Sequence, residues 1–331
     1  MRIAIGTDDG LRVIRWLAGE RSGTVTSRAF DGHSVVSLTS HSGVVYAAVP
    51  DSGVHKTSDR GATWQPAAAL PSGVHAETLA VSPSGDLLVG TEPAQLLRST
   101  DAGASWIDLA GFGALRETET WSEYGGRAAH VEAVAFDRHD AARLYAGVEI
   151  GGAYRSDDHG QTWNGVNDGL YDDIHDLVVD PRDGSRLFAA TGGGLYVSRD
   201  RGADWRPMAG PVGSLYATRL LAIAGSRAAA PSQTLLLLGT ADGPPSTWGR
   251  AGQKGGGKSW ISSDSGSTWT PLEPTALKGG TPITAFGADP ADPATVLVGT
   301  AGGRLLHGNL VEGRWQQLVY GAGAVRTILV V

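Results

Sequence analysis

Short apolar stretches alternate with glycine-rich polar turns along the whole chain, and their order repeats. Each repeat opens with an apolar stretch, and a second follows that ends in small residues, such as LLVGT at 87–91 or VLVGT at 296–300. A third stretch, such as GGAYRS at 151–156, and a fourth complete the repeat. Stretches of about five to seven residues between Gly-rich turns are typical of β-strands. The pattern therefore predicts a four-stranded antiparallel unit, whose strands we call A, B, C and D.

Counting the stretches predicts seven such units. The A strands are expected at 34–40, 76–82, 131–137, 174–180, 218–224, 283–289 and 324–331. The B strands are expected near 2–6 and at 44–49, 87–91, 144–148, 187–191, 236–240 and 296–300. Because the chain starts on a B strand and ends on an A strand, the C-terminal strand is expected to complete the N-terminal unit. Such a closure would remove the exposed sheet edges of an open array.

One phrase marks the turn between the third and fourth strands, Ser/Thr-x-Asp-x-Gly-x-Ser/Thr-Trp, which we call the box motif. It occurs at 57–64, 99–106, 156–163 and 262–269, and a variant with Asp204 at the second hydroxyl position occurs at 198–205. The copies recur at roughly 40 to 65 residues, which is the range of propeller blades with loop insertions. The first unit lacks the motif, and the last keeps only Gly313 and Trp315.

The box motif resembles the Asp-box of the sialidase-like BNR superfamily, and the resemblance covers nearly the whole chain. In that family the box is a structural turn: its Asp accepts backbone amides, its Gly takes a conformation that other residues resist, and its Trp packs between blades. The resemblance implies one all-β domain over residues 1–331, a seven-bladed β-propeller of four-stranded antiparallel blades closed by the C-terminal strand. The motif residues are accordingly expected to be structural, since a fold does not imply a function.

Sialidase activity is not expected. The enzymes of the superfamily use three arginines, a Tyr–Glu pair and an acidic residue, carry a Phe/Tyr-Arg-Ile-Pro motif, and have a six-bladed catalytic propeller. This sequence has no such motif, and its nearby arginines, Arg2, Arg12 and Arg15, lie on or beside the first B and C strands. The chain also resembles the seven-bladed photosystem assembly factors of this group, which bind proteins, but it lacks their basic patch and the export signal they usually carry.

Composition narrows the class of ligand. The net charge is −7 and Lys and Arg do not cluster, so a nucleic-acid partner is not expected. There is no cysteine, which excludes disulfides and thiolate sites. No apolar run approaches the roughly 18 residues of a membrane span, and the start MRIAIGTDDG lacks the apolar core of a signal peptide. A soluble, cytoplasmic protein is therefore expected.

Two long connections are predicted at the end of the units opposite the box turns, which we call the top face. One joins a D strand to an A strand at 108–130 and is rich in functional side chains: Glu117, Glu119, Trp121, Glu123, Tyr124 and Arg127. The other joins a B strand to a C strand at 241–258 and carries Trp248, Arg250, Lys254 and Lys258. Long loops on a rigid scaffold often carry function, and neutral drift is the alternative.

Histidines gather where the A strands enter the central channel at the same face. His33, His75 and His130 open three consecutive A strands, and His175 lies two positions further along the next one. Because side chains alternate along a strand, three pairs are expected to share a side. They are His75 with Glu77, His130 with Glu132, and Asp173 with His175. The comparable positions on the remaining units hold Arg219, Thr284 and Arg326.

Three interpretations of this pattern remain open. The four imidazoles could bind a first-row divalent metal, with Glu77 and Glu132 orienting them or taking part in catalysis. Without a metal, His and Glu could form a general acid–base pair. The third possibility is a water-filled channel without a catalytic role.

At the level of function, two hypotheses follow. The first is an enzyme, possibly metal-dependent, for a small anionic or polar substrate that Arg219 or Arg326 would receive. The second is a non-catalytic scaffold that binds a protein or a glycan through its top-face loops. In both, a small-molecule or glycan ligand would lie at the top face.

Overall fold

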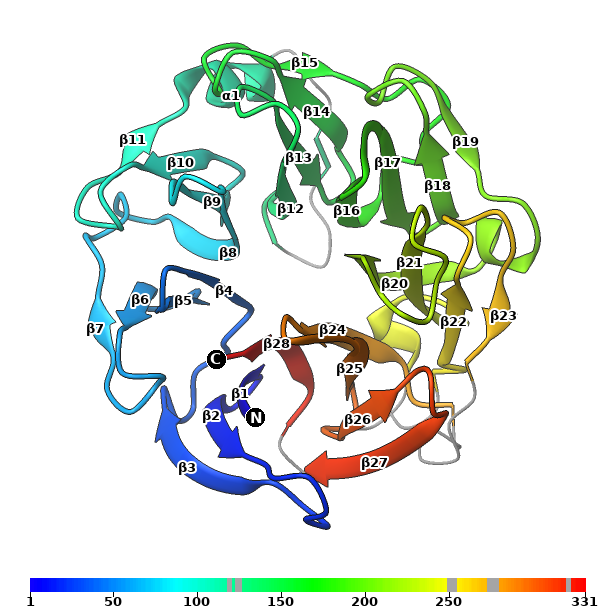
Figure 1. Cartoon of the computed structure of the whole chain (residues 1–331). Helices are drawn as coiled ribbons and strands as arrows, with labels where there is room; N and C mark the ends of the chain where they lie inside the picture. Colours follow the sequence, from blue (N-terminus) through cyan, green and yellow to red (C-terminus); the bar gives the residue numbers. More distant parts are fainter. Residues whose placement is uncertain (118–120, 123–126, 249–254, 273–279, 320–322) are drawn as a thin grey trace. The chain divides into compact units, whose positions relative to one another are not determined.

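Seven four-stranded antiparallel sheets follow one another along the chain, so the fold is a seven-bladed β-propeller (Figure 1). The computed structural model describes residues 1–117, 121–122, 127–248, 255–272, 280–319 and 323–331. These residues fall into two compact units. The first unit comprises Met1–Val36, Gly192–Gly194 and Met208–Val331, and the second comprises Ser37–Thr191 and Leu195–Pro207. A single domain over 1–331 stays a prediction.

The second unit holds four sheets, each with its strands in chain order from A to D. The first two are β4 (Ser37–His41), β5 (Val44–Val49), β6 (Gly53–Thr57) and β7 (Gln65–Pro66), and β8 (His75–Val81), β9 (Leu87–Glu92), β10 (Leu96–Ser99) and β11 (Ile107–Asp108). The others are β12 (Val131–Phe136), β13 (Leu144–Val148), β14 (Gly152–Ser156) and β15 (Asn164–Gly165), and β16 (Ile174–Asp180), β17 (Asp183–Thr191), β18 (Gly194–Ser198) and β19 (Trp205–Pro207). Two helical turns, α1 (Ala110–Gly113) and η1 (Ala114–Glu117), follow β11.

The first unit holds three sheets. They are β28 (Val325–Val330), β1 (Arg2–Thr7), β2 (Gly10–Arg15) and β3 (Thr24–Ala29); β20 (Tyr216–Ala224), β21 (Thr234–Ala241), β22 (Lys258–Ser262) and β23 (Thr270–Pro271); and β24 (Ile283–Asp289), β25 (Asp292–Thr300), β26 (Leu305–Asn309) and β27 (Arg314–Val319). Short 3-10 turns lie at η2 (Pro211–Gly213) and η3 (Pro245–Thr247). No helix in the described part of the chain is long and apolar enough to cross a membrane.

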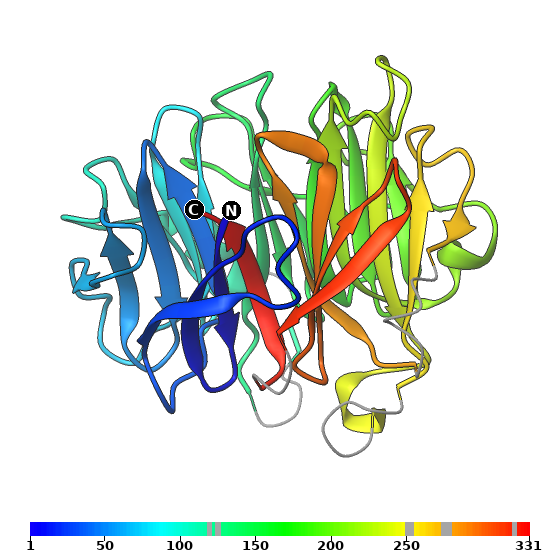
Figure 2. The ribbon, with the colours of Figure 1, turned by 60° about the horizontal axis from the view of Figure 1, so that its bottom comes forward.

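The predicted closure is confirmed. The C-terminal strand β28 pairs antiparallel with the N-terminal β1, with Ile3 opposite Val330 and Ile5 opposite Ile328 (Figure 2). The predicted A and B strands are also found, although β4 begins at Ser37 rather than at residue 34. The seven A strands are thus β4, β8, β12, β16, β20, β24 and β28.

The glycines of the B strands make room for the neighbouring sheet. A Cβ on Gly147 would lie 2.5 Å from Cγ2 of Ile174, which opens the next A strand. In the same way, a Cβ on Gly299 would lie 2.4 Å from Cγ1 of Val325. Real Cβ atoms do not approach other atoms so closely, because interiors are already close-packed. The small residues that end each predicted B strand are therefore packing positions between sheets.

The box motif folds as a turn held by its own side chains. In the copy at 99–106, Ser99 Oγ accepts a hydrogen bond from Gly103 N at 2.8 Å and donates one to Asp101 at 2.7 Å. Asp101 accepts the Ser105 hydroxyl at 2.6 Å and the Ser105 amide at 2.9 Å, and the hydrogen bonds from Ser105 and Ser99 lower its pKa to about 2. Ala102 and Gly103 are both left-handed, with φ of 57° and 80°, which explains the glycine.

The box turns also link neighbouring sheets of the second unit. The cation that precedes the motif donates to a backbone carbonyl in the box turn of the next sheet, and we call these contacts box ties. The donor and acceptor pairs are Lys56 with Ala102 O at 2.9 Å, Arg98 with His159 O at 3.1 Å, and Arg155 with Arg201 O at 2.9 Å. The ties from Arg98 and Arg155 join sheets that also share an apolar cluster.

Candidate functional site

The same irregularity recurs near the start of six A strands. Pairing with the B strand skips one residue after the first or the second paired residue, which is the pattern of a β-bulge. The skipped residues, here called bulge residues, are Glu77 in β8, Glu132 in β12, His175 in β16, Thr218 in β20, Thr284 in β24 and Arg326 in β28. A bulge re-aims a side chain and is common beside functional sites. Three of the four bulge residues that carry ionisable side chains lie in the second unit.

Two of the predicted positions are shifted. Arg219 was aligned with the glutamates, but the bulge residue of β20 is Thr218, and Arg219 pairs normally with Gly239. His33 was expected to open an A strand, but it lies exposed in a turn before β4, where its amide donates to Phe30 O at 2.9 Å. The first shift follows from the bulge of β20, and the second arises because β4 begins only at Ser37.

In the first unit the bulge residues Thr218 and Thr284 join sheets. Thr218 Oγ1 donates to Ile283 O at 2.6 Å, and Thr284 Oγ1 donates to Val325 O at 2.5 Å. Each acceptor is the first paired residue of the next A strand. A neutral hydroxyl at this position therefore stabilises the packing of neighbouring blades.

The two arginines predicted to receive an anionic substrate make intramolecular contacts. Arg219 Nε donates to Thr284 O at 3.2 Å. Arg326 Nε lies 2.5 Å from Asp8 Oδ1, and both of these side chains are close to half exposed. Part of the donor capacity of each guanidinium is thus already used within the chain.

Arg127 gathers two glutamates in the second unit. It comes from the long connection at 108–130, and its Nη2 lies 2.8 Å from Glu77 Oε1. Its Nε donates to Glu92 Oε2 at 2.7 Å, and the Ala128 amide donates to the other oxygen of Glu92 at 3.2 Å. Burial raises the pKa of Glu77, the charge of Arg127 opposes this rise, and nearby Glu132 adds to it. Glu77 is thus a buried carboxyl beside both a cation and a second carboxylate.

His130 is held between two further glutamates. Its Nε2 lies 2.8 Å from Glu149 Oε2 and 3.6 Å from Glu132 Oε2, and its Nδ1 lies 3.2 Å from Ala128 O. Burial lowers the pKa of His130, but the hydrogen bonds to Glu132 and Glu149 outweigh burial and place the pKa at about 10. The ring is therefore an imidazolium at neutral pH, with both nitrogens acting as donors. In that form it is neither a metal ligand nor a general base.

The remaining histidines lie differently from one another. His75 is exposed, and its Nδ1 lies 3.1 Å from Pro50 O, in the connection between β5 and β6 of the preceding sheet. Glu77 instead contacts Arg127, in the segment that leads into β12 of the following sheet. His75 and Glu77 thus contact different partners and do not meet, and a shared side for them stays a prediction. The other two pairs do meet, since His130 approaches Glu132 and His175 Nε2 lies 3.2 Å from Asp173 Oδ2.

Among the described residues, no group of three or more His, Asp or Glu side chains is arranged to hold a metal ion. The metal hypothesis for His33, His75, His130 and His175 has no further support from this geometry and stays a prediction. What the structure brings together is a set of six side chains at the A-strand ends of two adjacent sheets, which we call the charged bulge site. They are Glu77, Glu92, Arg127, His130, Glu132 and Glu149, with four carboxyl groups and two cations.

Sequence reasoning missed Glu92 and Glu149. A signal for both was present, because each follows the small residues that end a B strand, in GTE at 90–92 and GVE at 147–149. An antiparallel turn brings the end of a B strand opposite the start of its A strand, as the pairing of His75 with Glu92 shows. An acidic residue at the end of a B strand therefore lies beside the first residues of the A strand with which it pairs.

The tryptophans of the long connections are part of the core. Trp121 Nε1 donates to the Tyr154 hydroxyl at 2.6 Å, and its ring lies 5.4 Å from that of Phe112. Trp248 is buried against Ala241 and Ala301. Both contacts favour a structural role. Of the other residues singled out in the connections, Lys258 opens β22, the side chain of Glu117 is not described, and Glu119, Glu123, Tyr124, Arg250 and Lys254 lie outside the described residues.

Comparison with known proteins places this geometry in context. The Sortilin-Vps10 family model (sortilin, neurotensin receptor 3) matches residues 151–278, well under half of the chain. No curated protein matches the sequence.

Solved structures match over most of the chain. A GH74 enzyme from Niastella koreensis is 20% identical over 86% of this chain and 45% of its own, with a TM-score of 0.65. YCF48 bound to D1 peptide is 16% identical over 92% and 86%, with a TM-score of 0.60, and the RRP9 WD40 repeats are 16% identical over 99% and 89%, at 0.61. The chain spans less than half of the GH74 enzymes it resembles. At these identities the likeness establishes the propeller fold, which serves both enzymes and non-catalytic scaffolds.

Proposed function

We propose that the chain is a non-catalytic binding module, and that the charged bulge site recognises a basic side chain of a peptide or protein. The bulge position carries the argument. Thr218 and Thr284 show that a neutral hydroxyl satisfies the fold at this position. The charged residues Glu77 and Glu132 are therefore not needed to pack the blades, and Arg127 and His130 offset the cost of burying them.

The charge balance of the site favours a cationic ligand. Four carboxyl groups face two cations, Arg127 and the His130 imidazolium, so negative charge is in excess at neutral pH. The raised pKa of Glu77 is the expected response of a buried carboxyl in such a field. Glu132 and Glu149 keep about a quarter of their side-chain surface exposed, so a ligand can reach them. A guanidinium or ammonium group would supply the missing cation.

Binding of defined peptides tests this proposal. A labelled octa-arginine peptide should bind the full chain, and an octa-glutamate peptide should not. Glu132→Gln should weaken binding of the arginine peptide by about tenfold. The matched control is Asp108→Asn, which removes the same charge from an exposed position of β11 and should change affinity less than about twofold. Equal losses in both variants, or no binding by the wild type, would reject the basic-ligand site.

The acid–base enzyme is the second candidate, because Glu77, whose pKa is raised by burial, lies near a second carboxyl group, that of Glu132. A first-row metal held by the histidines, a small-molecule or glycan ligand and a cytoplasmic location also stay predictions.

Membership of the Asp-box group is our proposal as well, supported by five box turns. Elemental analysis of untagged protein separates the metal-dependent enzyme from the binding module, because stoichiometric iron, copper, zinc or manganese would favour the enzyme.

A further inference from the structure

A second site lies in the first unit and shares no residue with the charged bulge site. A cavity of about 690 Å³ opens beside the sheets that contain β2 and β26. This volume is within the range of small-molecule sites. The residues that matter for its chemistry are Trp16, Asp289, His307, Asn309, Trp315 and Gln316.

Aromatic rings line the cavity and are held in place by the chain. The rings of Trp16 and His307 lie 4.4 Å apart between centroids and are tilted by 40°. Trp16 Nε1 donates to Glu20 O at 3.1 Å, which fixes the indole. Trp315 covers Gly308 so closely that a Cβ there would lie 2.4 Å from the ring. The two indoles are thus preorganised, and a flat apolar ring face is a surface on which the C–H face of a pyranose can stack.

The charged groups of the cavity are largely neutralised. Asp292 pairs with Arg227 at 3.1 Å, and Glu312 pairs with Arg314. Burial lowers the pKa of His307, although Asp289 and Asp292 oppose this, so its ring is neutral at pH 7. The lining is therefore mixed rather than strongly acidic, unlike the charged bulge site.

Neutral hydrogen-bonding groups complete the lining. Thr295 donates to Asp292, Asn309 Oδ1 accepts the amides of Val311 and Glu312, and Gln316 Nε2 donates to Glu20 O. The capacity left for a ligand is the Asn309 amide group, the Gln316 side-chain oxygen and the carboxylate of Asp289. A ligand with many hydroxyl groups could pair with these atoms as it displaces water. A quaternary ammonium ligand could also lie on the indoles, but it has no N–H or O–H and could not donate to the oxygens.

From these contacts we propose that the cavity binds a neutral carbohydrate, with Trp315 as the stacking surface and the polar groups of β24, β26 and β27 as hydroxyl partners. The inference is independent of the proposed basic-ligand site, because it depends on different residues of the other unit. No catalytic step is implied.

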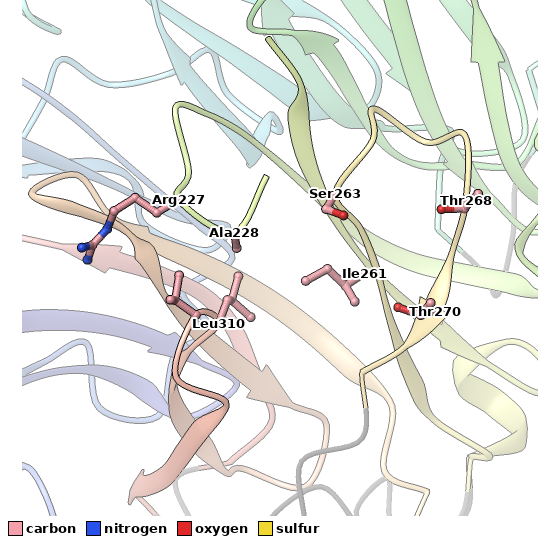
Figure 3. A pocket seen from close by; sticks show the side chains of 8 residues that line it. Arg227, Ala228, Ile261, Ser263, Thr268, Thr270 and Leu310 are labelled. Carbon is pink, nitrogen blue, oxygen red and sulfur yellow. The ribbon is translucent and has the colours of Figure 1, made fainter. Parts of the chain in front are cut away.

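A smaller neighbouring cavity of about 230 Å³ is a second candidate for a ligand site in the first unit (Figure 3). Its hydroxyls come from Ser263, Thr268 and Thr270, and an arginine at its edge would suit an anion. Figure 3 shows the guanidinium of Arg227 directed away from these hydroxyls, and it instead pairs with Asp292. The cation and the hydroxyls therefore do not converge on one ligand.

The test is titration of the full chain with glucose, galactose, maltose and cellobiose, followed by calorimetry and by saturation-transfer NMR on the sugar protons. At least one sugar should bind saturably, with transfer strongest at the C–H protons of one pyranose face. Trp315→Ala should weaken that binding by about tenfold. A second variant, His307→Phe, serves if Trp315→Ala does not fold. It keeps a ring against Trp16 but removes the ring nitrogens, and it should also weaken binding.

The control is Val311→Ala, which removes an exposed side chain outside this cavity and should leave affinity unchanged. Three outcomes would overturn the proposal: no saturable binding by any of the four sugars, equal binding by all variants, or binding of tetramethylammonium in place of sugar. The octa-arginine experiment reports on the other unit, so the two proposals can fail separately.

Discussion

The two compact units use the same position of the fold in different ways. In the first unit, Thr218 and Thr284 are bulge residues that donate neutral hydrogen bonds to the next A strand. In the second unit, the bulge residues Glu77 and Glu132 lie in ion pairs with Arg127 and His130, and the His175 ring lies 3.2 Å from Asp173. A bulge adds a side chain that the sheet itself does not need to pair. The comparison teaches that the position is available for chemistry, and that three of its four ionisable residues lie in the second unit, Arg326 being the fourth.

The opposite ends of the sheets differ as well. Box ties from Lys56, Arg98 and Arg155 join the sheets of the second unit. In the first unit the residue before the box motif at 262–269 is Ile261, which cannot donate from its side chain. Cations before the box motif join sheets of the second unit, whereas in the first unit the bulge hydroxyls join sheets together with the Arg227–Asp292 ion pair.

The largest expected effect comes from removing the closing strand of the first unit. Deleting residues 324–331 removes every partner on the A-strand side of β1 and the buried side chains of Val325 and Ile328. We expect loss of the folded state and aggregation, since the hydrogen-bonding edge of β1 becomes exposed. Circular dichroism and size-exclusion chromatography measure this. Deletion of Val331 alone is the control, and a truncated protein with an unchanged melting temperature would contradict the closure.

Replacing His130 should destabilise the second unit and change its response to pH. His130→Asn leaves the partly buried Glu149 without its cation, which should lower the free energy of unfolding by about 2 kcal/mol at pH 7. The folded pKa of about 10 lies above the unfolded value of 6.5. The stabilisation by the imidazolium is therefore complete below about pH 6.5 and is lost as the pH rises through 10.

Urea unfolding at several pH values between 7 and 10 measures this effect. Wild-type stability should fall across that range, and the His130→Asn variant should show a smaller fall. His33→Asn is the matched control, because His33 is exposed in the first unit and should leave the slope unchanged. Identical slopes for wild type and His130→Asn would show that His130 is neutral in the folded state.

The smallest effect tests the box ties. Arg98→Met keeps the aliphatic part of the side chain but loses the hydrogen bond to His159 O and the ion pair with Asp86. We expect a loss of about 1 kcal/mol in the free energy of unfolding. Ile261→Met at the equivalent position of the first unit should cost less than that, because it removes no polar contact. Equal losses at the two positions would mean that the ties contribute nothing specific to the second unit.

Much of the fold could be predicted because its signals are local. The apolar stretches, the Gly-rich turns and the box motif each depend on residues close together in the chain, as in the bonds among Ser99, Asp101 and Gly103. The order of strands at the two termini was enough to predict that β28 joins β1. The candidate site was predicted in part: the pairs His130–Glu132 and Asp173–His175 meet, and the role of the site stays open.

By itself, the sequence determined the number of units, the closure and the box turns, since hydrophobic periodicity and short-range hydrogen bonds specify them. Only the tertiary structure decided which side chains meet at the A-strand ends. Arg127 lies 35 residues from Glu92, and their contact depends on the stacking of two sheets. The bulges arise from pairing with the B strand and packing against the next blade, so their one-residue shifts at Glu77 and Thr218 leave no local trace. Side-chain direction in a sheet reverses with each residue, and a register that depends on distant partners therefore decides the chemistry of the site.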